Sequence, residues 1–134
     1  MNKLNLKKLI AYWQKGSNND WMVAQKLFKL GHYNYCLFFC HLALEKQLKA
    51  LVVAQIKDQA PFTHDLYVLA LKAGLVFDLE QRKNLETVTT FNISARYDNV
   101  KLAFYKKATK KYAEKYLKIS ADLKIWLEKE LTKK

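Results

Sequence analysis

Hydrophobic residues recur at three- and four-residue intervals along most of the chain, which is the pattern of helices with one apolar face. The clearest early example covers residues 4–30. We expect a helix there that ends at Gly31, because glycine commonly terminates helices. Residues 16–19 read Gly-Ser-Asn-Asn, a poor helix-forming run. The pattern therefore predicts a kink at this run, or two helices that meet there with Asn18 or Asn19 as a cap.

The segment 33–57 is apolar almost all round rather than on one face. Only His41 interrupts the apolar run 36–44, and a helix of this kind belongs inside a bundle. Charge then begins abruptly with Glu45, Lys46 and Lys49. Because an unpaired buried charge is costly, these side chains need partners, and Glu45 and Lys49 have the spacing of a favourable pair on one helix.

Three further helices follow from caps and apolar spacing. We expect a short one after Thr63 that ends near Ala73 and Gly74, and one that Asp78 caps and that runs to about Phe91. A last helix is predicted from about Lys101 to Lys129. No segment has the pattern of a strand. The sequence therefore predicts one all-α domain over 1–134, an up-and-down antiparallel bundle of four to five helices.

Composition supports this prediction and also bears on the compartment in which the protein is expected. Of the 134 residues, 51% are hydrophobic, three are Gly and one is Pro, so there is enough apolar material for a core and little to interrupt helices. Cys36 and Cys40 have neither metal-ligand nor disulfide-framework spacing and are expected to be small core residues. With no signal peptide and no span of membrane length, we expect a cytoplasmic protein that makes no membrane contact.

The formal net charge is +12. Among the basic side chains only Arg82 and Arg96 are arginine. A lysine-rich surface attracts phosphates diffusely, whereas sequence-specific base recognition more often uses arginine. Charge alone leaves two interpretations open, namely contact with a nucleotide or nucleic acid, or a lysine-rich composition that reflects only an AT-rich genome or a warm habitat.

Few residues suggest chemistry. Asp20 lies on an apolar stripe and needs a partner, for which Lys46 and Lys49 are candidates. Arg96, in Ala-Arg-Tyr-Asp just before the last helix, can bind either a phosphate or a nearby carboxylate. No histidine spacing indicates a metal, and neither a phosphate-binding glycine loop nor a nucleophile motif is present, so we expect no metal and no cofactor.

Several motifs taken together resemble the HEPN domain family, from about Trp13 to Trp126. They are Trp13-x3-Ser17-x2-Asp20-x3-Ala24, Gly31-x-Tyr33, Phe38-Phe39-Cys40-His41-Leu42-Ala43-Leu44-Glu45-Lys46, Lys49-Ala50-Leu51, Pro61-x2-His64-Asp65-Leu66 and Phe91-Asn92-Ile93-Ser94-Ala95-Arg96-Tyr97. The resemblance implies a helical bundle that usually pairs as a homodimer. It also implies a minimal nucleotidyltransferase as partner in a toxin–antitoxin pair, and either nucleotide binding or metal-independent RNA cleavage.

The ribonuclease members of the family carry Arg-x4–6-His near the start of the last helix. Here Arg96 is followed at that spacing by Lys101, Leu102 and Ala103, and no histidine occurs after it. A surface lysine titrates too high to replace histidine as a base at neutral pH. The sequence therefore favours a protein without the family's cleavage activity.

The resulting hypothesis is a catalytically degenerate HEPN protein that binds nucleotide or RNA as a homodimer. Arg96 and Lys101 would contact phosphate, and a polar network of Asp20, Glu45, Lys46, Lys49 and His64 would lie behind them. One alternative is an active ribonuclease with an atypical site that uses Arg96, Tyr97, Asp98 and either His41 or His64. The other is a helical dimerisation module without a ligand.

Overall fold

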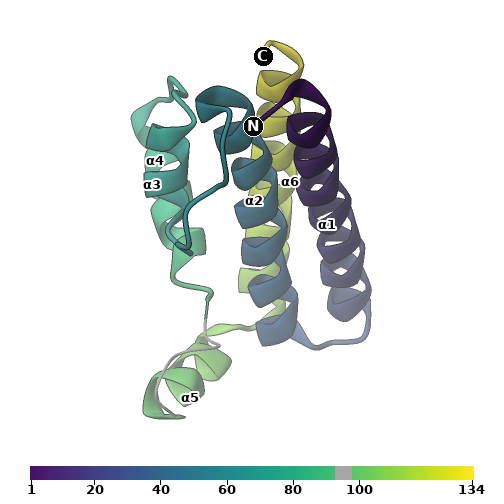
Figure 1. Cartoon of the computed structure of the whole chain (residues 1–134). Helices are drawn as coiled ribbons and strands as arrows, with labels where there is room; N and C mark the ends of the chain where they lie inside the picture. Colours follow the sequence, from purple (N-terminus) through teal and green to yellow (C-terminus); the bar gives the residue numbers. More distant parts are fainter. Residues whose placement is uncertain (93–97) are drawn as a thin grey trace.

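The computed structural model of the chain describes residues 1–92 and 98–134. The described part is all-helical, as the sequence predicted, and contains no strand. In chain order the helices are α1 (Lys3–Lys29), α2 (Tyr33–Ile56), α3 (Leu66–Lys72), α4 (Leu79–Thr89), α5 (Asp98–Lys107) and α6 (Lys110–Thr132). The three long helices α1, α2 and α6 lie side by side, and α3 and α4 pack on the other side of α2 (Figure 1).

The central element is α2, which contacts each of the other five helices. Its residues are buried on every side, as expected from its continuous apolar sequence. Leu44, Leu48 and Leu51 form the main core together with Phe91 and Leu127 from other parts of the chain. Cys36 and Cys40 are both buried in a smaller cluster with Ala24, and the prediction that they are core residues is confirmed.

The alternative of two helices that meet at residues 16–19 is wrong, because α1 continues through these residues without a break. Tertiary contacts explain why. The Ser17 hydroxyl is buried and donates to the Ala43 carbonyl of α2 at 2.7 Å. Gly16 leaves room for the stem of Lys46, since a Cβ added at this glycine would lie 3.0 Å from Lys46 Cδ. These small residues therefore bring two helices close together rather than end one. The predicted end of the helix is confirmed, because Gly31 follows it with φ +81°.

Two other boundaries differ from the prediction. Asp65, and not Thr63, caps α3, since its carboxylate accepts from the backbone N–H of Tyr67 and Val68. The predicted single last helix is divided into α5 and α6, because the Thr109 side chain caps the start of α6. The predicted cap at Asp78 is confirmed and forms a capping box with Gln81.

The division places α5 apart from the bundle, at the end where the turn between α1 and α2 also lies (Figure 1). This helix has no buried residue. Its connection to the bundle is aromatic, because the half-buried Phe104 ring lies 5.7 Å from the buried ring of Phe91. A mostly solvated helix is thus held at one end of the molecule. None of the described helices is long and apolar enough to traverse a bilayer.

Candidate functional site

A buried carboxylate organises the polar residues of α2. Glu45 Oε2 accepts from Lys49 Nζ at 2.9 Å, and Glu45 Oε1 accepts from His64 Nδ1 at 2.8 Å. Both Glu45 and Lys49 are buried in the bundle, with side chains only 6% and 8% exposed. Each carboxylate oxygen therefore has its own donor, which is the arrangement that makes a buried charge tolerable.

The same cluster fastens the loop between α2 and α3. His41 Nε2 donates to the backbone carbonyl of His64 at 2.8 Å, while the His64 ring donates to Glu45. Two bonds from one loop residue thus hold it against α2. Burial lowers the pKa of His41 below its ordinary value of 6.5, which favours the neutral ring.

The side chain of His64 is 62% exposed although one of its ring nitrogens is held by a buried carboxylate. Because Nδ1–H donates to Glu45, the other ring nitrogen, Nε2, is left with the lone pair and is the one available for proton transfer. A carboxylate-oriented, accessible imidazole has the geometry of a general acid or base. Within the described residues this pair is the arrangement best suited to acid–base chemistry.

The cluster extends to α1 through Lys49, whose ammonium lies 5.2 Å from the centroid of the Trp13 ring. Trp13 also lines a surface pocket of about 310 Å³ together with Tyr12, Asn19 and Lys46. Tyr12 is 67% exposed, and its ring meets that of Trp13 edge to face. Trp13 therefore contacts the buried ammonium of Lys49 and also lines an open surface pocket that contains aromatic and lysine side chains.

Asp20 forms an ion pair with Lys46 across α1 and α2, with Lys46 Nζ 2.7 Å from Asp20 Oδ2. Lys46 was one of the two partners considered from sequence, and Lys49 pairs instead with Glu45. The predicted polar residues thus form two separate groups in the structure, Asp20 with Lys46 and Glu45 with Lys49 and His64.

The predicted phosphate-contact residues occupy a different part of the chain. Arg96 and Tyr97 lie outside the described residues. Asp98 is the first residue of α5, and Lys101 is exposed on that helix. Lys101 was predicted to lie at the start of the last long helix, and the division of that helix places it on α5 instead, apart from the bundle (Figure 1).

Two functional features were not anticipated from sequence. His41 was recognised only as a lone histidine, yet His41, Glu45 and Lys49 recur every four residues and so share one face of α2. That spacing is visible in the sequence and was a usable signal. The buried ammonium of Lys124 contacts Asn18 Oδ1 at 2.7 Å and Glu128 Oε1 at 3.0 Å. The spacing of Lys124 and Glu128 was visible in the sequence, whereas the contact with Asn18 had no such signal because it depends on the packing of α6 on α1.

No group of metal-binding side chains occurs among residues 1–92 and 98–134.

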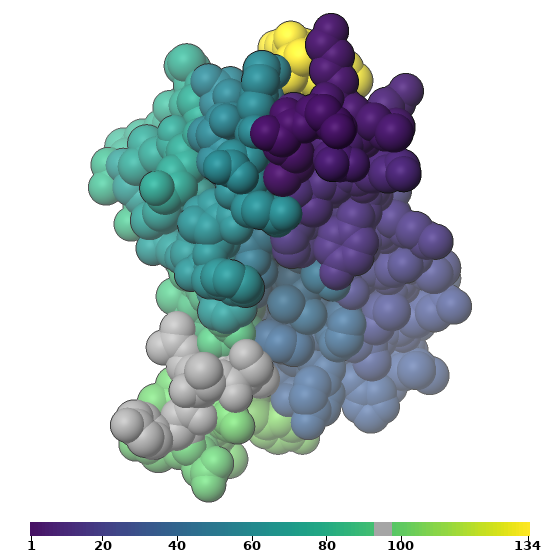
Figure 2. Space-filling model, in the orientation of Figure 1, coloured from purple at the N-terminus to yellow at the C-terminus, as the bar shows by residue number. Residues whose placement is uncertain are grey.

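Figure 2 shows the surface of the molecule, with α1 and the loop after α2 side by side on the visible face. The described site residues provide hydrogen-bond donors and acceptors, positive charge, and one imidazole, that of His64, which Glu45 holds in a fixed orientation.

Comparison with known proteins places these features in a family. The HEPN domain model matches residues 10–130, which is nearly the whole chain. No curated protein shows significant similarity to the sequence.

Two solved structures share the fold. TT1696 from Thermus thermophilus superimposes with a TM-score of 0.74 at 21% identity, covering 90% of this chain and 96% of TT1696. ST0689, described as an archaeal HEPN homologue, gives a TM-score of 0.69 at 16% identity, covering 91% of this chain and 97% of ST0689. These similarities show the fold, and the family match over residues 10–130 shows that the chain belongs to the HEPN domain family.

Proposed function

We propose that the protein binds the phosphates of RNA or of nucleotides through α5 and the first turns of α6. The observation that carries this proposal is the charge of this segment. Residues 98–118 hold two acids, Asp98 and Glu114, against seven lysines. The lysines are Lys101, Lys106, Lys107, Lys110, Lys111, Lys115 and Lys118, all of them exposed. Such an excess attracts polyanions and releases their counterions on binding.

The shape of the molecule supports the same proposal. Since α5 has no buried residue and stands away from the bundle, its lysines are exposed and accessible to a phosphate backbone (Figure 1). Tyr105 is 63% exposed among them and offers a face on which a base can stack. Arg96, two residues before α5, is proposed as an additional phosphate contact. Lysine in place of arginine favours contact with phosphates over recognition of bases.

Binding without cleavage is the preferred form of this function. The HEPN ribonuclease motif needs a histidine after its arginine, and this chain has none after Arg96. We further propose, from membership of the family, that the protein is a cytoplasmic homodimer and partners a minimal nucleotidyltransferase in a toxin–antitoxin-type pair. Large apolar side chains on α1 that remain exposed, such as Leu4, Met22 and Tyr12, support association with a second protein surface.

The binding proposal is tested by fluorescence anisotropy of a labelled single-stranded RNA over a series of salt concentrations. The wild type is expected to bind with an affinity that falls steeply with salt, and Lys106→Ala/Lys110→Ala is expected to bind more weakly and with a smaller salt slope. The matched control is Lys72→Ala/Lys129→Ala, which removes the same charge from exposed positions at the other end of the bundle. Equal losses in both double variants would show diffuse attraction and contradict a site on α5.

A second candidate function is metal-independent RNA cleavage, and the Glu45–His64 pair is the observation that favours it. In this case His64 would act as general acid or base toward a bound phosphodiester. This cleavage is tested by incubating RNA with the protein in a chelating buffer and measuring the length of the RNA. Cleavage that His64→Ala abolishes and His32→Ala retains would establish the ribonuclease, since His32 is an exposed histidine outside the cluster. If the protein binds the RNA but the RNA stays intact, cleavage is contradicted and only the binding function stands.

A further inference from the structure

A pocket unrelated to the polar cluster lies where α1 begins and α2 ends. The two helices are antiparallel and joined by a short turn, so the first turns of α1 lie beside the last turns of α2. The floor of the pocket is apolar and is formed by Leu6 and Ile10 of α1 with Val53 and Ala54 of α2. Its volume is about 230 Å³. This is below the roughly 300–1,000 Å³ of pockets for drug-sized ligands, so it suits a short chain.

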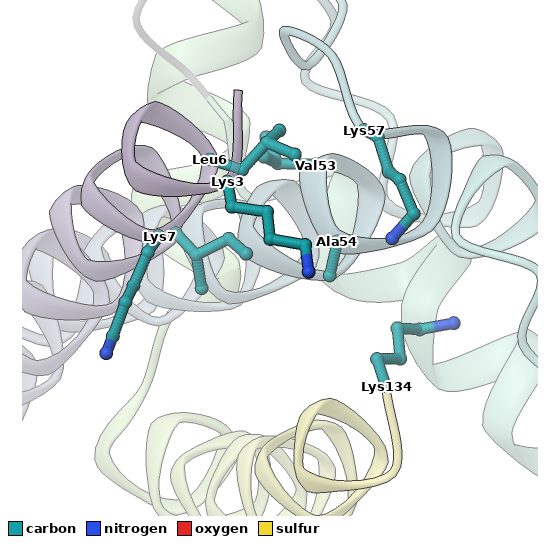
Figure 3. Close-up of a pocket in the computed structure, with 8 residues that line it drawn as sticks. Lys3, Leu6, Lys7, Val53, Ala54, Lys57 and Lys134 are labelled. Carbon is teal, nitrogen blue, oxygen red and sulfur yellow. The ribbon is translucent and has the colours of Figure 1, made fainter. Parts of the chain in front are cut away.

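The rim of this pocket is positively charged. It contains Lys3, Lys7, Lys57 and Lys134 and no acidic residue. In the close-up, Lys3 and Lys57 extend toward one another across the pocket near Ala54, whereas Lys7 points away (Figure 3). Within the described residues, Lys3, Lys7 and Lys57 form no ion pair.

Lys134 has a different role from the other rim lysines. Its ammonium donates to Gln55 Oε1 at 2.6 Å and to the Ala73 carbonyl at 3.0 Å, and is thus engaged within the protein. It ties the end of α6 to the ends of α2 and α3. The cations available to a ligand are therefore Lys3 and Lys57, one on each side of an apolar floor.

We propose that this pocket binds a free medium-chain carboxylate, with the alkyl chain on the Leu6–Ile10–Val53–Ala54 floor and the carboxylate between Lys3 and Lys57. Charge complementarity carries the choice of ligand, because a carboxylate gains Coulomb attraction to both exposed ammonium groups that a neutral apolar ligand cannot gain, and a cationic ligand would be repelled. The small volume favours a single short chain over a partner helix. The site lies at the other end of the bundle from α5 and is independent of the proposed RNA binding.

Sodium octanoate is the probe, and the readout is the backbone amide chemical shifts of Val53 and Ala54. Saturable shifts are expected, with affinity on the order of tenfold weaker in Lys3→Ala/Lys57→Ala. Hexanoate is expected to bind up to about fifteenfold more weakly, since each buried methylene contributes about fourfold. Octylammonium is expected not to bind. The control Lys26→Ala/Lys29→Ala removes the same charge from the other end of α1.

A filled pocket provides a second variant that leaves the charge unchanged. Ala54→Phe is expected to abolish binding, whereas Ala11→Phe, at an exposed position of α1, is expected to retain it, and circular dichroism establishes that each variant is folded. Equal binding of octanoate and octanol would overturn the proposal, as would shifts that do not saturate. Binding only to vesicles that contain anionic lipid would also overturn it, because it would show a membrane-attracted lysine surface instead of a carboxylate site.

Discussion

At the scale of single residues, Glu45 has the strongest structural role among the polar side chains. It is buried and accepts from both Lys49 and His64, so one carboxylate neutralises a buried ammonium and fixes the orientation of an exposed imidazole. Removing one member of such a pair leaves an uncompensated buried charge.

We therefore expect Glu45→Gln to lower the free energy of unfolding by about 3 kcal/mol, since the ammonium of Lys49 remains buried without a counter-charge. Urea denaturation of both proteins measures the difference. Glu86→Gln is the control, because it removes an exposed helical pair with Arg82 and is expected to change stability by less than about 1 kcal/mol. Equal effects of the two substitutions would show that Glu45 has no special role.

His41 predicts a dependence of stability on pH. Burial lowers its pKa in the folded protein below the ordinary value of 6.5, although the His64 carbonyl and Glu45 oppose the shift and Lys49 adds to it. The unfolded chain therefore binds more protons in this range, and stability is full above about pH 6.5 and falls as the pH falls toward the lowered pKa. Chemical denaturation at several pH values is expected to show this fall in the wild type and a smaller one in His41→Gln. An unchanged fall in the variant would assign it to other groups.

At the scale of elements, the division between α5 and α6 shows how one side chain sets a boundary. The apolar stripe 112–126 belongs to α6, while the preceding lysine-rich turns form a separate helix with no buried residue. Thr109 accepts from the Tyr112 N–H and caps α6 at the junction. This cap separates α5, which has no buried residue, from α6, whose apolar stripe stabilises the bundle and whose first turns carry the remaining lysines of the proposed phosphate site.

We expect Thr109→Ala to reduce stability by about 1 kcal/mol, because the first turn of α6 loses a hydrogen-bond acceptor. Thr109→Ser keeps the hydroxyl and is expected to retain most of the stability. Thermal denaturation of the three proteins makes the comparison. If alanine and serine had the same effect, the cap would not be what stabilises this junction.

At the scale of the whole molecule, the fold separates three surfaces. The α5 end holds the lysine-rich helix, the middle of the bundle holds the Glu45 cluster, and the opposite end holds the carboxylate pocket between α1 and α2. Because these regions share few side chains, substitutions in one are expected to leave the others intact. The paired control variants above depend on this separation.

The proposed homodimer makes a prediction at this scale. The chain has a mass of 15.8 kDa, and sedimentation or light scattering is expected to give about twice that value. Tyr12→Glu, which places a charge in the exposed apolar surface of α1, is expected to weaken association if α1 is part of the interface. A monomeric mass for the wild type would contradict the dimer directly.

The sequence by itself determined the helical class, the central position of α2, the core role of both cysteines and membership of the HEPN family. The first three features depend on local periodicity and composition, whereas the family resemblance rests on several motifs taken together. The spacing of His41, Glu45 and Lys49 on one helix face was also available from sequence, as was the absence of a histidine after Arg96.

Only the tertiary structure decided which charges pair between elements and where the chain forms surfaces. Asp20 pairs with Lys46, and His64 reaches Glu45 from a loop nineteen residues away, whereas the pair of Glu45 with Lys49 already followed from their spacing on α2. Likewise, Gly16 and Ser17 remain helical because α2 packs against them, and the pocket near Lys3 exists because the two ends of an antiparallel pair meet there. The physical reason is the same in each case. These features depend on side chains that are distant in the chain, and the free energy of their contacts outweighs local preference.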